Sequence, residues 1–131
     1  MKKTGNINRD ISEVIAGMGH LDTLTIGDAG LPIPDGVRRI ELALRQGVPS
    51  FLQAVEAVYS ELCVQEVVIA RETTTVSPHV ADELKTLFKD IPFRVVSHEE
   101  LKQLTGKSKA VIRTGEFTPY ANVVLVAGVV F

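Results

Sequence analysis

The stretch Val123-Val124-Leu125-Val126, near the end of the 131-residue chain, has no polar face. A strand that is apolar on both faces is typical of a sheet that is covered on both sides. This stretch therefore predicts either a central strand of a layered fold or a strand buried in a subunit interface. We expect the strand to extend over residues 122–130.

Helices and strands alternate along the rest of the chain. Further strands are predicted at residues 22–27, 37–44 (whose pattern also fits a helix), 64–70, 93–96 and 110–113. Helices are predicted after the cap residue Asn8, after Ser50 with its capping box to Gln53, after Ser77 with Pro78 in the first turn, and over residues 97–104. This alternation indicates a three-layer α/β/α fold with a mostly parallel, mixed central sheet, formed by residues 1–131 as a single domain.

Charge and cysteine content restrict the class of protein. The formal net charge is −2 and the basic residues are scattered, which argues against a nucleic-acid-binding protein. Cys63 is the only cysteine, so no intramolecular disulfide can form. Polar residues follow Met1-Lys2-Lys3 where a signal peptide would be apolar, and the apolar run at residues 121–131 is too short to span a bilayer. We expect a cytoplasmic protein with no membrane partner.

Two residues suited to sugar chemistry stand at the ends of the predicted strand at residues 22–27. His20 lies before this strand and Asp28 after it, and glycines flank both. A histidine can transfer protons and a carboxylate can accept hydrogen bonds from hydroxyl groups. The arrangement would suit a small polar substrate, although a turn aspartate can also bond to its own backbone.

The histidines differ in their expected helix environments. His98 lies in the first turn of its predicted helix, where the helix dipole and Lys102, four residues on, both disfavour the imidazolium form. His20 follows the end of a helix, where the charged form is favoured. One neutral and one protonated imidazole would form an acid/base pair. The alternatives are that His98 is simply solvated and that His20 satisfies terminal carbonyl groups.

The connection before the last strand adds candidate ligand-binding groups. Tyr120 offers a ring for stacking and a hydroxyl group, Ala121 offers its backbone, and Asn122 offers both a donor and an acceptor. His20, Asp28 and His98 lack the HxH or HxxxH spacing of a metal site, so we expect no bound metal.

Several of these sequence motifs occur together in one family. Gly19-His20, Asp28-Ala29-Gly30-Leu31-Pro32-Ile33-Pro34, His98 after a strand and Thr118-Pro119-Tyr120-Ala121-Asn122 make the chain resemble the ribose/fucose mutarotase family over almost its whole length. The resemblance implies an isomerase that interconverts the β-pyranose and β-furanose forms of D-ribose in ribose catabolism, with no metal or organic cofactor. It also implies a ring-shaped homo-oligomer, a decamer, in which C-terminal residues complete a neighbour's site.

The resemblance further implies roles for individual residues. His20 would be the proton donor; His98 is the second catalytic candidate because of its position in the first turn of a helix, not because of the resemblance. The sugar would be bound by Asp28, His98, Tyr120, Ala121 and Asn122, and the spacing from His98 adds Lys102 to this set. Two alternatives stay open: a non-catalytic sugar-binding module that regulates ribose uptake, and a mutarotase for fucose or a related monosaccharide.

Overall fold

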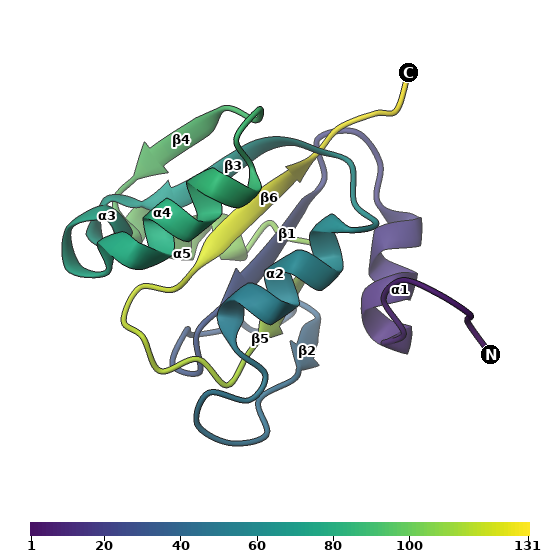
Figure 1. Cartoon of the computed structure of the whole chain (residues 1–131), viewed down its shortest axis with the longest axis horizontal. Coiled ribbons are helices and arrows are strands. Elements are labelled where there is room, and N and C mark those ends of the chain that lie inside the picture. The colour runs from purple at the N-terminus through teal and green to yellow at the C-terminus, as the bar shows by residue number, and fades with distance from the viewer.

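The computed structural model describes all 131 residues and is built around a six-stranded sheet with the strand order β2-β5-β1-β6-β3-β4 (Figure 1). The strands are β1 (Thr23–Gly27), β2 (Arg39–Glu41), β3 (Val64–Ala70), β4 (Phe93–Val96), β5 (Ala110–Arg113) and β6 (Val123–Ala127). Three pairings are parallel, and β6 runs antiparallel to both of its neighbours, β1 and β3. The predicted mixed sheet is confirmed.

β6 is a central strand, as its lack of a polar face predicts. Val123, Leu125 and Ala127 pack into the larger apolar cluster on one face of the sheet. Val124 and Val126 pack into the smaller cluster on the other face. The strand ends at Ala127, earlier than predicted, and the residues that follow it are largely exposed.

Helices cover both faces of the sheet and form the two outer layers. They are α1 (Arg9–Gly17), α2 (Phe51–Tyr59), α3 (Arg71–Val76), α4 (Pro78–Leu87) and α5 (His98–Thr105). The larger cluster contains residues of α1, α2 and α4, whereas α5 supplies Leu101 to the smaller one. Figure 1 shows α2 and α4 in front of the sheet and α5 behind it. The predicted three-layer arrangement is confirmed. Each of the helices is too short or too polar to span a bilayer.

The predicted helix starts are visible as side-chain caps. Asn8 Oδ1 accepts a hydrogen bond from Ile11 N at 3.0 Å. At α2, Ser50 Oγ accepts from Gln53 N at 3.2 Å while Gln53 Oε1 accepts from Ser50 N at 3.0 Å, which completes a capping box. At α5, the side chain of Ser97 accepts from Glu100 N. These caps locate three helices directly from sequence.

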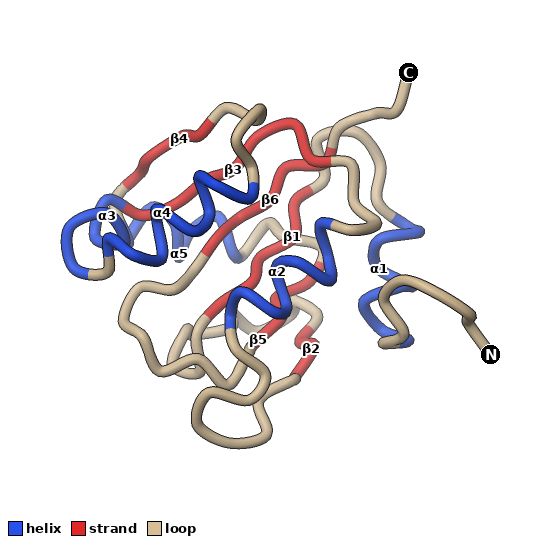
Figure 2. Tube along the Cα trace, in the orientation of Figure 1, coloured by secondary structure: helices blue, strands red, loops and turns tan.

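Two segments differ from the prediction. Residues 37–44 form only the short edge strand β2, and the rest of the connection to α2 is loop, as is the connection from β5 to β6 (Figure 2). The short helix α3 follows β3 directly and is not predicted. α4 begins at Pro78 after Ser77, as predicted, and Ser77 makes no side-chain cap bond there.

Candidate functional site

The candidate polar residues gather at one end of the sheet because of the strand directions. Asp28 follows the last residue of β1, and Asn122 precedes the first residue of β6. Since β1 and β6 are antiparallel neighbours, these two strand ends lie side by side. α5 begins with His98, just beyond the end of β4. The carboxyl ends of strands in an open α/β sheet are the usual place for a ligand.

Asp28 and Asn122 are joined by two hydrogen bonds. Asp28 N donates to Asn122 Oδ1 at 2.9 Å, and Asn122 Nδ2 donates to Asp28 Oδ2 at 3.0 Å. Asn122 is 1% exposed. Burial and the two hydrogen bonds together fix its side chain. A side chain at Gly27 would place its Cβ 2.8 Å from Asn122 Oδ1, which explains why glycine ends β1.

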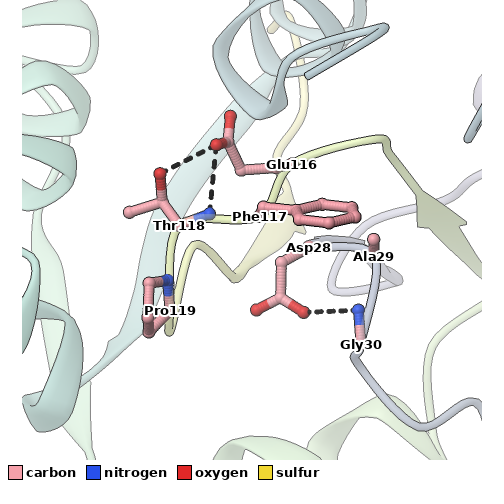
Figure 3. A pocket seen from close by; sticks show the side chains of 7 residues that line it. All are labelled: Asp28, Ala29, Gly30, Glu116, Phe117, Thr118 and Pro119. Carbon is pink, nitrogen blue, oxygen red and sulfur yellow. Dashed lines mark hydrogen bonds between the residues drawn. The ribbon is translucent and has the colours of Figure 1, made fainter. Parts of the chain in front are cut away.

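The carboxyl group of Asp28 is held partly out of water. Burial raises the pKa of Asp28, and hydrogen bonds from Gly30 N–H and the Asn122 amide, with the nearby His98, oppose this only in part. Gly30 N donates to Asp28 Oδ1 at 2.9 Å (Figure 3). Each oxygen therefore accepts one strong hydrogen bond and keeps a lone pair for a ligand hydroxyl.

A pocket of about 360 Å³ opens beside Asp28. It is lined by Asp28, Ala29, Gly30, Glu116, Phe117, Thr118 and Pro119 (Figure 3). Ala29 N donates to Glu116 O at 2.8 Å, so the two loops that form the walls are tied together. Phe117 is 61% exposed. Asp28 is the only predicted site residue in this lining.

Glu116 has a structural use in the pocket wall. Its Oε2 accepts from Phe51 N, at the start of α2, at 3.1 Å. Its Oε1 accepts from Thr118 N at 3.2 Å and from Thr118 Oγ1 at 2.8 Å. Burial raises the pKa of Glu116, but these bonds outweigh it and hold the pKa below its ordinary value.

His98 and Tyr120 form an aromatic pair next to the Asp28–Asn122 pair. Their ring centroids are 5.0 Å apart, with an angle of 83° between the planes. His98 N donates to Glu72 Oε2 at 2.9 Å, and His98 Nδ1 is buried without a hydrogen-bond partner. Tyr120 has a left-handed backbone with φ 60°. Asp28, His98, Tyr120 and Asn122 thus share one end of the sheet.

His20 lies at the other end of the sheet. It is exposed, and its Nε2 is 2.9 Å from Gln65 Oε1, near the start of β3. The length of β1, about 16 Å for five residues, separates it from Asp28 and His98. The chain contains no group of three or more His, Cys, Asp or Glu side chains that could hold a metal ion. The acid/base pair of His20 and His98 does not assemble within one chain.

The other two predicted residues lie closer to the site. Lys102 is on α5, and its Nζ is 2.6 Å from Glu99 Oε1. Ala121 is fully buried and its N–H donates to Thr118 O at 3.4 Å. Two residues that the sequence did not indicate support the site: Glu72 accepts from the backbone N–H of His98, and Glu116, in the pocket wall, accepts from Phe51 N. Spacing carries no signal for such long-range contacts.

Comparisons with known proteins agree over the full length of the chain. The model of the RbsD / FucU transport protein family matches residues 1–130. D-ribose pyranases of Symbiobacterium thermophilum and Coprothermobacter proteolyticus are 56% and 54% identical, with 100% of both sequences covered in each case. The structure of Bacillus subtilis RbsD complexed with D-ribose has a TM-score of 0.97 at 46% identity, covering 100% of both chains. A fucose mutarotase of Streptococcus pneumoniae shares the fold, with a TM-score of 0.81 at 20% identity and 96% of both chains covered.

Proposed function

Because the chain belongs to the RbsD / FucU transport protein family, we propose that it interconverts the β-pyranose and β-furanose forms of D-ribose. The observation that carries this proposal is the full-length identity of 56% to a D-ribose pyranase. The site agrees with it, since Asp28 and Asn122 offer acceptors and donors suited to sugar hydroxyl groups.

The reaction needs proton transfers and a place to hold an open-chain sugar. A base removes the proton from the anomeric hydroxyl group while an acid protonates the ring oxygen, and the ring opens to the aldehyde. A different hydroxyl group then attacks the aldehyde, with the proton transfers reversed. General acid/base catalysis of this kind typically contributes about 10²–10⁴-fold.

The groups at the end of β1 and before the start of β6 bind the sugar in this proposal. The carboxylate of Asp28 accepts from sugar hydroxyl groups, and the Tyr120 ring packs against one face of the sugar. His98 faces the same space and serves as one proton-transfer group. Lys102, one turn along α5 from His98, supplies a further donor at the edge of the site.

His20 is the proposed proton donor and comes from a second copy of the chain. Within one chain His20 and His98 are separated by about the length of β1, so a site that uses both must lie between subunits. A homo-oligomer, a decamer by family resemblance, would supply such a site. The single free Cys63 is consistent with the proposed cytoplasmic location.

Saturation-transfer NMR on D-ribose tests the proposal. Added protein should increase the exchange rate between the pyranose and furanose signals in proportion to its concentration. His98→Ala should reduce this rate at least about a hundredfold. A protein that binds ribose but leaves the exchange rate at the uncatalysed value would instead be a sugar-binding module. Faster ring exchange of fucose than of ribose would show that the substrate is another monosaccharide.

A further inference from the structure

The short helix α3 and the residue that ends it, Ser77, contact both ligand-binding elements from outside the pocket. Figure 1 shows α3 at the end of the sheet where α5 begins. We infer that Glu72, Thr73 and Ser77 are positioning residues, which hold His98 and Tyr120 in the geometry that binds the sugar. The inference rests on the proposed function and adds residues that act indirectly, by holding His98 and Tyr120 in place.

Thr73 and Ser77 hold the backbone of Tyr120 and its neighbour. Thr73 Oγ1 donates to Tyr120 O at 2.7 Å, and Ser77 Oγ donates to Pro119 O at 2.6 Å. Both donors are buried, with 0% and 2% exposure. Tyr120 has φ 60°, a left-handed conformation that is strained for a residue with a side chain. Such a conformation persists where the surroundings fix it, and two buried hydroxyl groups on consecutive carbonyls do so.

Glu72 holds the other half of the aromatic pair. Its Oε2 accepts from His98 N at 2.9 Å. His98 is the first residue of α5, and an N–H in the first turn has no acceptor within its own helix. The carboxylate therefore fixes the point where α5 begins, and with it the His98 ring, 5.0 Å from Tyr120.

Other hydroxyl groups on α3 form hydrogen bonds only within the helix, in contrast to those of Thr73 and Ser77. Thr74 Oγ1 donates to Arg71 O at 2.6 Å, and the Thr75 hydroxyl bonds only to carbonyls of the same helix. Thr73 instead donates out of the helix to Tyr120, and Ser77 to Pro119 instead of capping α4. Adjacent Glu72 and Thr73 thus connect α3 to two separate elements of the site.

A set of threonine variants tests the inference. Thr73→Val removes the hydroxyl group at nearly constant volume, Thr73→Ser keeps it, and Thr74→Val makes the same change one residue on, where the bond stays within α3. We expect Thr73→Val to raise the KM for D-ribose about tenfold, the usual effect of one buried hydrogen bond, with a smaller change in kcat. Thr73→Ser and Thr74→Val should stay within about twofold of the wild type.

A second readout does not depend on activity. The edge-to-face contact with Tyr120 should shift the ring-proton NMR signals of His98, one of three histidines in the chain. Thr73→Val and Ser77→Ala should change this shift, and the signals of His20, at the other end of the sheet, should stay in place. Ser77→Ala serves as the test if Thr73→Val does not fold.

The outcomes separate the two proposals. An unchanged His98 signal and KM in Thr73→Val, or equal losses in Thr73→Ser and Thr73→Val, would overturn the positioning role. A wild-type protein without exchange activity would overturn the proposed function, and the NMR shift of His98 would still decide whether α3 holds the aromatic pair.

Discussion

Asp28 and Glu116 line one pocket, yet the pKa of Asp28 lies above its ordinary value and that of Glu116 lies below it. Burial is the largest single influence on both pKa values and raises each of them; it prevails at the more deeply buried Asp28, whereas at Glu116 the hydrogen-bond donors outweigh it. Glu116 accepts from two backbone N–H groups and a hydroxyl group. Asp28 accepts from one backbone N–H and one side-chain amide. The oxygens of Glu116 are therefore occupied by hydrogen bonds that stabilise the fold, whereas those of Asp28 can still accept hydrogen bonds from a ligand.

The stability of Asp28→Asn relative to the wild type should increase as the pH rises. The folded pKa of Asp28 is raised above its unfolded value, so between these values the folded state binds more protons than the unfolded state. The wild-type free energy of unfolding therefore falls through this window, and the asparagine variant lacks that loss. Urea unfolding at about pH 3.5 and about pH 7 measures the difference between the two proteins.

The matched control for this prediction is Asp35→Asn, the same change at an exposed turn of the following loop. Its stability difference from the wild type should vary little with pH. An Asp28→Asn difference that stays constant or falls with rising pH would contradict the effect of burial on Asp28.

Glu116→Gln should show the opposite pH dependence. The pKa of Glu116 is lowered in the folded state, so its contribution to stability is present above the unfolded pKa and is lost as the pH falls through the folded value. At about pH 7 the variant should lose about 1–3 kcal/mol, because an amide group replaces an acceptor of N–H and O–H bonds. Glu56→Gln, at an exposed position on α2, is the control in the same unfolding experiment and should change little.

Asn122→Ala should lose both stability and ribose exchange. The substitution leaves Asp28 N–H without its acceptor and Asp28 Oδ2 without its donor, which costs about 1–3 kcal/mol of the free energy of unfolding. Asn8→Ala removes the cap of α1 and costs about 1 kcal/mol, but it should retain exchange. If the two variants keep equal exchange rates, Asn122 has no role beyond the fold.

Local patterns predict the elements that depend on local chemistry. The apolar sequence of β6 predicts that both of its faces are covered. The caps at Asn8 and Ser50 are predictable because each is formed by hydrogen bonds within one helical turn. α3 is different, because its Thr73-Thr74-Thr75-Val76 run is β-branched and has low helix propensity. Contacts with distant residues such as Tyr120 and His98 accompany it, and no local pattern contains them.

Local sequence patterns also fail to predict the edge of the sheet and the arrangement of the site residues. Residues 37–44 alternate like a strand, but only Arg39–Glu41 pair with β5, whose four residues offer no partner beyond Arg113. The proximity of Asp28 and Asn122 depends on β1 and β6 being antiparallel neighbours, which spacing alone does not give. The separation of His20 from His98 follows from topology, since His20 precedes β1, His98 follows β4, and both strands run in the same direction.

The separation of His20 and His98 leads to a complementation test of the proposed shared site. His20→Ala and His98→Ala proteins should each be inactive in ribose exchange. If every site takes His20 from one copy and His98 from another, unfolding and refolding an equal mixture should restore about one quarter of the sites, because copies combine at random. Each variant refolded alone is the control. A mixture that stays as inactive as the separate variants would show that the two imidazoles do not act together across subunits.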